Sequence, residues 1–254
     1  MARELRSALW RCLGFFVGLE LMITPAILWW PDFAPNVANL KPFTAGLPVL
    51  GDMLDMVDEG GVVAYVIAQH FFKAINALGA AAAILFAIGV VAGEVHRGTL
   101  EVWLARPVTR TRLLTERYAL GLLSIAIPVF ASSATIPWLL SMVDESMQMA
   151  DLMRCSLHSF LFVLCIYSVT FLWSALDSQP IRIAVVLLFL AVFQFAIYMI
   201  KTITNYSLFR LVDVETYMEI VDLDRLDWAV AGGMIALNAA CFIAALAAFK
   251  RRIP

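Results

Sequence analysis

Charged residues are scarce in this chain, and several common catalytic motifs are missing from it. Asp, Glu, Lys and Arg make up 15% of the 254 residues, whereas 62% are hydrophobic and the mean hydropathy is +0.86. A soluble domain carries about 25% charged residues. The sequence has no phosphate-binding G-x-x-x-x-G-K-[ST] loop and no G-x-G-x-x-G, H-E-x-x-H or G-x-S-x-G. We predict that the chain is not an enzyme and that its energy comes from a gradient or a partner.

Long apolar runs dominate the sequence instead. A helix of about 20 apolar residues spans the roughly 30 Å hydrocarbon core of a bilayer. We predict an all-α polytopic membrane protein forming one domain over residues 1–254, without a cleavable signal peptide. The second run is long enough that we expect it to be tilted or to begin outside the membrane. The six predicted spans are residues 10–30, 62–92, 118–140, 155–176, 181–200 and 228–249.

The distribution of basic residues predicts the orientation. With both termini in the cytoplasm, the inner segments hold twelve basic and five acidic residues, a net charge of +7, and the outer segments hold five basic and fourteen acidic residues, a net of −9. Basic residues favour the cytoplasmic side of a membrane. We therefore predict a multi-pass protein of a bacterial cytoplasmic (inner) membrane, with cytoplasmic termini.

No metal site is predicted. Soft sulfur with imidazole would suit Cu(I), and such side chains gather at the outer end between spans three and four. They are Met142, Met147, Met149, Met153, Cys155 and His158. Their spacing is irregular, however, and methionine is an ordinary apolar residue at a membrane interface. We favour the apolar interpretation.

The inner segment 94–114, between spans two and three, is the one long, strongly basic polar interruption. Gly98 is expected to end or bend the second helix, because glycine readily adopts the left-handed conformation. A short helix should follow and stop before Pro107. Thr109 or Thr111 is expected to cap the third span. The product is a short knob on the cytoplasmic side that carries an aromatic residue and several arginines.

This segment resembles the permease subunit of ABC-2 type ABC transporters. The resemblance rests on the strings G-T-L-E and P-V-T-R between spans two and three, and it extends to the six spans, the inner termini and the N-terminal R-E-L-R stretch. It implies a cytoplasmic coupling helix seated in a separate nucleotide-binding ATPase, which would carry ATP and Mg, whereas this chain holds no cofactor. The residues we assign to ATPase coupling are Glu94, Arg97, Gly98, Thr99, Leu100, Glu101, Trp103, Leu104, Arg106, Pro107 and Arg110. The alternative is that the arginines only contact lipid phosphates on the inner leaflet.

Three residues of the first span are further candidates. Glu20 lies near mid-membrane, where an acid is costly and therefore suggests a role. It either faces a translocation path or is a hydrogen-bonded structural acid; a pair with Lys73 is not expected, because the two differ in depth. Gly14 and Gly18 form a G-x-x-x-G pair that favours close helix contact. Together with the two-fold plan that the resemblance implies, they predict a homodimer seam near span one.

The outer segment 201–227 repeats apolar residues at roughly helical spacing among acids, which predicts a short helix either in the outer leaflet or on the surface. The resemblance places re-entrant helices here, but the segment lacks an apolar helical hairpin. An extracytoplasmic accessory protein is a possible partner, alongside membrane lipids; nucleic acid is not expected.

The predicted function is that of a permease in an ATP-driven exporter that moves an amphipathic or lipid-like substrate outward. Two other functions stay open. One is a non-transporting ABC-2 assembly that transmits mechanical change to an extracytoplasmic partner. The other is a gradient-driven carrier, although such a protein should carry paired titratable groups at mid-membrane.

Overall fold

Helices make up almost all of the structure. The computed structural model describes residues 2–44, 46–99 and 108–251, and it is 87% helical with no strand in that part of the chain. Six helical stretches there are long and apolar enough to cross a membrane, which confirms the all-α polytopic prediction. They are Leu5–Thr44, Pro48–Ile88, Arg110–Ser141, Met149–Leu176, Pro180–Tyr198 and Trp228–Arg251.

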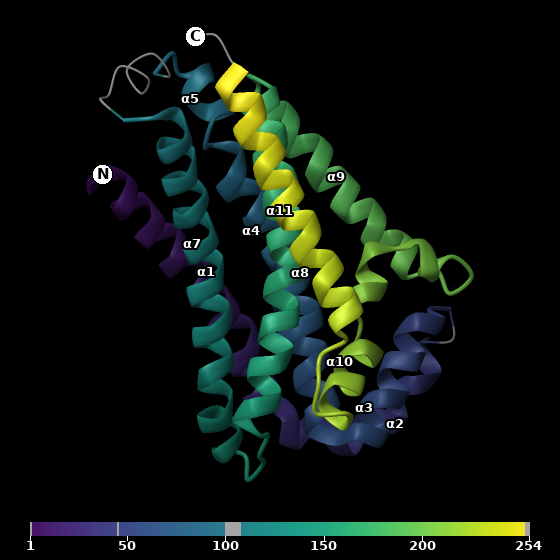
Figure 1. The fold of residues 1–254 in the computed structure, drawn as a ribbon. Helices are drawn as coiled ribbons and strands as arrows, with labels where there is room; N and C mark the ends of the chain where they lie inside the picture. The colour runs from purple at the N-terminus through teal and green to yellow at the C-terminus, as the bar shows by residue number, and fades with distance from the viewer. Residues whose placement is uncertain (1, 45, 100–107, 252–254) are drawn as a thin grey trace.

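One helix, α8 (Met149–Leu176), forms the centre of the bundle (Figure 1). It packs against α11 (Trp228–Arg251), α4 (Gly79–Ile88) and α7 (Arg110–Ser141), while α1 (Ala2–Phe33) lies along α7. A helix that is apolar on every face is expected to be surrounded by protein or lipid. Of the most apolar stretch of α8, 61% is buried inside the chain itself, the largest share among the six spans described.

The second span is composite. Its α3 (Pro48–Val66) is interrupted at Gly61, which has φ +60°. A π-helix, η3 (Ile67–Leu78), follows and continues into α4, which ends at Ile88. A short α5 (Ala92–His96) comes after a turn. The predicted span 62–92 stays a prediction; the continuous helix ends at Ile88, and a turn at 89–91 precedes α5.

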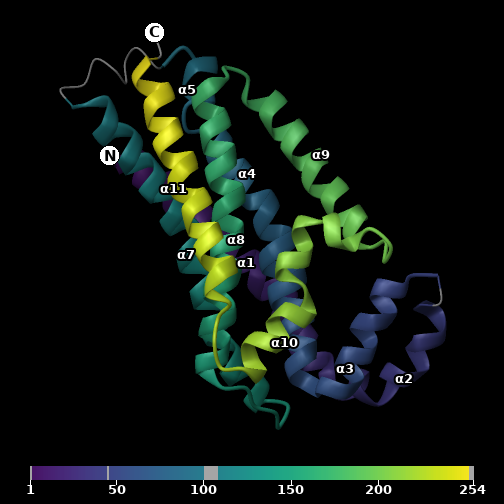
Figure 2. The same ribbon diagram turned by 45° about the vertical axis from the view of Figure 1, so that its right-hand side comes forward.

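The connections that the charge distribution predicts to be outer are helical as well, and the terms inner and outer keep this predicted orientation below. The segment after α1 contains short helices, among them α2 (Val37–Leu40), before α3 begins, and Lys41 Nζ pairs with Asp55 at 2.9 Å and Asp58 at 2.7 Å. Figure 2 shows α2 and α3 side by side at one end of the molecule. The prediction of a short helix within 201–227 is confirmed. Its elements are the 3₁₀ turns η4 (Thr204–Tyr206) and η5 (Leu208–Val212), followed by α10 (Val214–Asp222).

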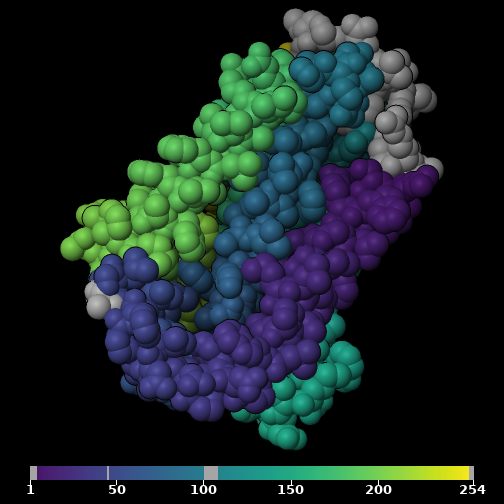
Figure 3. All heavy atoms as spheres, turned by 180° about the vertical axis from the view of Figure 1, so that it is seen from behind, coloured from purple at the N-terminus to yellow at the C-terminus, as the bar shows by residue number. Residues whose placement is uncertain are grey.

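Two spans are covered by little protein. Only 17% of the most apolar stretch of α9 (Pro180–Tyr198) is buried, and only 22% of that of the first span. Seen from behind, α1 and α9 flank the second span (Figure 3). From the opposite side, α9 slants away from α11 (Figures 1 and 2). Both helices thus present apolar surface outward, where lipid or another protein is expected.

Candidate functional site

The inner end of the second span is held to α8 by one hydroxyl. The turn between α4 and α5 leaves the amides of Val91 and Ala92 without partners in their own helix, and both donate to Ser174 Oγ on α8, at 3.2 and 3.0 Å. The same hydroxyl donates to the carbonyl of Ile88 at 3.2 Å. Backbone groups buried in a membrane protein need such partners. Ser174 is fully buried and therefore fixes where α5 leaves the bundle.

The C-terminus of α5 is closed by Gly98. This residue has φ +67°, and its amide donates to the carbonyl of Val95 at 3.0 Å, while the amide of Thr99 donates to that of Glu94 at 3.0 Å. These two bonds form a Schellman motif, the usual closure of a helix by a left-handed glycine. This geometry agrees with the expectation that Gly98 ends the second helical region.

Glu94 is the polar centre of this turn. Its carboxylate accepts a hydrogen bond from the Thr99 hydroxyl and another from Arg97, at 2.5 Å, which is also an ion pair. Partial burial raises the pKa of Glu94, but the bonds from Thr99 and Arg97 outweigh it and hold that pKa below its usual value. The carboxylate therefore stays ionised and locks the turn at neutral pH.

We call the turn at 94–99, with its contacts to Ser174, the first joint. A second joint lies where the chain enters α7. Thr109 is the N-cap of α7, and its side chain accepts from the amide of Arg112 at 3.3 Å. Arg110 reaches the C-terminus of α11, where it donates to the carbonyls of Phe249 and Lys250 at 3.5 and 3.4 Å. A cation at a helix C-terminus is electrostatically favourable. Of the two predicted caps, Thr109 is the one present, and Arg110 holds α11.

Five assigned coupling residues, Glu94, Arg97, Gly98, Thr99 and Arg110, thus lie in these two joints. The other assigned residues lie outside the described residues: Leu100, Glu101, Trp103, Leu104, Arg106 and Pro107. Nine residues, 100–108, separate Thr99 from Thr109. The hydrogen bonds of the two joints connect the ends of this stretch to α4, α8 and α11.

The other predicted inner connection is the turn between α8 and α9. Asp177 accepts from the amides of Ser178 and Gln179, at 2.6 and 3.1 Å, and pairs with Arg182 at 2.6 Å. The Arg182 guanidinium holds the pKa of Asp177 below its usual range. This short turn is much smaller than the segment 94–114.

Glu20 lies between α1 and α7. Its two carboxylate oxygens accept from the hydroxyls of Thr24, at 3.3 Å, and Thr135, at 2.8 Å. Lys73 instead donates to Gln69 at 3.2 Å, and no Glu20–Lys73 ion pair is found among the described residues. Hydrogen bonds from two neighbours favour the structural interpretation of Glu20 over the translocation path.

The small residues of α1 face partly outward. A side chain at Gly14 would meet open space, whereas one at Gly18 would lie 3.4 Å from Leu78. Gly18 therefore serves packing within the chain, and Gly14 lies on the exposed side, beside Leu13 and Val17, which are 50% and 44% exposed. The dimer seam stays a prediction, with Gly14 better placed for it than Gly18.

A buried polar cluster under the π-helix was not anticipated from the sequence. Tyr217 of α10 is fully buried, accepts from the amide of Asn76 at 2.7 Å and shares a hydrogen bond with Ser159 of α8 at 2.5 Å. Nearby on η3, His70 contacts the Ser133 hydroxyl at 3.0 Å. π-Helical turns often accompany functional sites. Here the cluster connects η3 and α10 to α8. In the sequence, the only feature that could have indicated the cluster was the presence of polar residues inside apolar runs.

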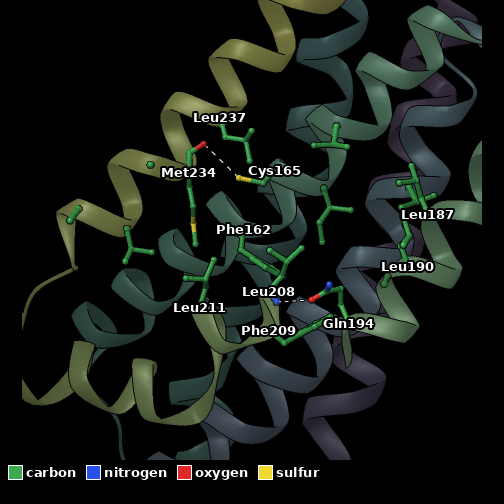
Figure 4. Close-up of a pocket in the computed structure, with 17 residues that line it drawn as sticks. Phe162, Cys165, Leu187, Leu190, Gln194, Leu208, Phe209, Leu211, Met234 and Leu237 are labelled. Carbon is green, nitrogen blue, oxygen red and sulfur yellow. Dashed lines mark hydrogen bonds between the residues drawn. The ribbon is translucent and has the colours of Figure 1, made fainter. Parts of the chain in front are cut away.

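A large apolar cavity opens beside α8. Its volume is about 470 Å³, within the range of small-ligand sites. Figure 4 shows Phe162 and Cys165 of α8 between Met234 and Leu237 of α11 and residues of α9. The amide oxygen of Gln194, a rare polar group there, accepts from the amide of Leu208 at 2.9 Å. The cavity suits an alkyl group.

Two members of the sulfur and imidazole cluster, Cys155 and His158, have other contacts or are buried in the chain. No group of three His, Cys, Asp or Glu side chains that would hold a metal occurs in the described ranges. His158 Nε2 instead donates to the carbonyl of Leu211 at 2.7 Å, and Cys155 is buried. These contacts agree with the apolar, structural interpretation.

Comparison with known proteins supports the resemblance seen in the coupling segment. The family model described as "ABC-2 family transporter protein" matches residues 35–252, which include the whole segment 94–114 and five of the six spans. No curated protein and no solved structure gave a significant match. The match covers most of the chain. The structure adds six helices that are long and apolar enough to span a membrane, and a segment between the second and third of them that is fixed at both ends. The chain therefore belongs to the ABC-2 transporter family, as a multi-pass membrane permease.

Proposed function

We propose that this permease is the membrane subunit of an exporter whose separate ATPase docks on the segment 94–114. The observation that carries the proposal is the pair of joints at its ends. Ser174 and Gly98 fix the exit from α5, and Thr109 and Arg110 fix the entry into α7. ATP and Mg would bind to the partner. Closure of the ATPase would push on 100–107, and the joints would pass that displacement to α4, α7 and α11.

A double variant that removes an aromatic side chain and reverses one charge in the segment 94–114 tests the docking proposal. We expect Trp103→Ala with Arg106→Glu to abolish co-purification and ATP hydrolysis by the partner while membrane insertion persists, because buried aromatic and arginine anchors dominate interfaces. Arg182→Glu is the matched control. Arg182 is exposed, lies in the other predicted inner connection and pairs with Asp177 at 2.6 Å.

This control separates docking from lipid contact. If the arginines only contact lipid phosphates, charge reversal at Arg182 and at Arg106 should act alike. Unchanged ATPase activity in the double variant, or an equal loss in Arg182→Glu, would overturn the docking proposal.

The substrate side of the proposal is an amphipathic or lipid-like molecule moved outward. The apolar cavity beside α8 supports this class, because its described lining offers few polar groups to a glycan. Screening ATPase stimulation across lipids, hydrophobic cations and glycan precursors tests the class. We expect lipids or hydrophobic cations to stimulate, and to do so equally in Glu20→Gln, because Thr24 and Thr135 hold Glu20 within the chain. Stimulation by anionic glycan precursors alone would contradict the proposed class.

A homodimer with a seam on α1 completes the proposed assembly. Leu13 and Val17 point outward, whereas Phe15 and Leu19 are 5% and 0% exposed. In a background without native cysteines, single cysteines at 13 and 17 should therefore form crosslinked dimers, and cysteines at 15 and 19 should not. Crosslinking without this periodicity, or one permease per complex, would refute the seam.

A further inference from the structure

A second, polar cavity adjoins the apolar one at the outer end of α11. Its volume is about 580 Å³. Leu211, Ala229 and Val230 line both cavities, so the two adjoin at the first turn of α11. Trp228, which lines the polar cavity, is 67% exposed. Tryptophan in such a position marks the boundary between hydrocarbon and headgroups.

The polar cavity carries charges of both signs. Arg210 is engaged by Asp213 and Glu215, and Asp227 caps α11 by accepting from the amide of Ala229 at 2.8 Å. Arg225 and Glu219 are exposed and take part in no ion pair within the described part of the chain. One guanidinium and one carboxylate thus remain for a ligand.

His158 also lines this cavity. Its Nε2 donates to the carbonyl of Leu211, so the neutral ring presents Nδ1 as an acceptor. Nδ1 is buried and has no hydrogen-bond partner among the described residues. A buried acceptor without a partner is unusual in a native structure and calls for a ligand or an ordered water.

The charges define the headgroup. A guanidinium binds phosphate well, and a carboxylate attracts an ammonium group. We propose that the two cavities together bind one zwitterionic phospholipid of the outer leaflet, with an acyl chain beside α8 and α11 and an aminophosphate headgroup between Arg225 and Glu219. A helix of a second copy would fill the apolar part but leave both charges unused.

Two adjacent glycines provide a matched test of the chain cavity. A Cβ added at Gly233 or at Gly232 meets nothing within 4 Å, but only Gly233 lines the cavity. The purified, delipidated permease is titrated with phosphatidylethanolamine, and bound lipid is counted by native mass spectrometry. We expect one tight site in the wild type, a loss of about tenfold or more in affinity for Gly233→Phe, and no change for Gly232→Phe.

The headgroup is tested with phosphatidylglycerol carrying the same acyl chains. Arg225→Gln and Glu219→Gln should each weaken phosphatidylethanolamine binding by about fivefold, the effect of one exposed ion pair. Lys201→Gln, a change in an outer cation paired with Asp52 at 2.7 Å, should have no effect. Wild-type binding should favour phosphatidylethanolamine over phosphatidylglycerol.

Equal binding of the two lipids, equal effects of Gly233→Phe and Gly232→Phe, or a dimer that shields position 233 would overturn the proposal. The site does not depend on the proposed export function, because lipid binding is measured on the permease without its ATPase. A failed binding test leaves the ATPase docking proposal standing, and a failed docking test leaves the lipid site standing.

Discussion

The inner and outer ends of α8 contact their neighbours in different ways. At the inner end, Ser174 makes three directional hydrogen bonds with the joint between α4 and α5. Farther out, Phe162 and Cys165 line an apolar cavity beside α9 and α11. Hydrogen bonds fix one geometry, whereas apolar contacts are non-directional. The difference supports the two proposals, that the inner end transmits displacement and that the outer half accommodates an apolar guest.

Among the changes considered, removal of the Ser174 hydroxyl should destabilise the inner end of α8 the most. Ser174→Ala leaves the buried amides of Val91 and Ala92 without acceptors, and we expect a loss of about 2–5 kcal/mol in the free energy of unfolding. Chemical denaturation in micelles measures it. Ser141→Ala is the control, because this exposed hydroxyl bonds only to the carbonyl of Trp138 in its own helix. Equal stability of the two variants would contradict the bracing role of Ser174.

Tyr217→Phe should have the next largest effect. It removes the hydroxyl that connects Asn76 and Ser159 and leaves buried polar groups unpaired, which costs about 1–3 kcal/mol of folding free energy. Tyr206→Phe, at a side chain that is 79% exposed, should change nothing measurable. Denaturation midpoints compare the two, and an unaffected Tyr217→Phe would show that the cluster does not hold α10.

Gly98→Ala should weaken the turn at the end of α5. Alanine at φ +67° is strained by about 1–2 kcal/mol, so the Schellman closure of α5 should loosen. Limited proteolysis at the arginines of 94–114 should then accelerate severalfold. Gly89→Ala is matched, since Gly89 has φ −76° and open space at its Cβ. Identical digestion of both variants would argue against a fixed turn.

The smallest expected effect is the pH dependence of the same turn. Because the folded-state pKa of Glu94 is lowered, its contribution is fully present above the unfolded value of about 4.3 and is lost as pH falls through the folded value. Proteolysis of the segment should therefore increase only below about pH 4. Glu94→Gln should remove this pH dependence, and a transition near neutral pH would contradict the assignment.

The sequence predicted the parts of this fold that depend on local patterns. Six apolar runs, the end of the second helical region at Gly98 and a cap at Thr109 follow from composition and local backbone chemistry. The π-helix and the Ser174 bond do not, because they depend on contacts between residues more than 80 positions apart, as between Val91 and Ser174. The cavities likewise depend on how α9 slants from α11, which helical periodicity does not specify.

Site-specific photocrosslinking on the two inner connections tests the central claim most directly. A benzoylphenylalanine replaces Trp103 in the segment 94–114 or Ser178 in the turn between α8 and α9, in membranes that contain the complete complex. We expect the variant with the photocrosslinker at position 103 to form a nucleotide-sensitive adduct with the ATPase, and the variant at position 178 to form none or far less. Adducts from position 178 alone, or equal adducts from both, would contradict coupling through the segment 94–114.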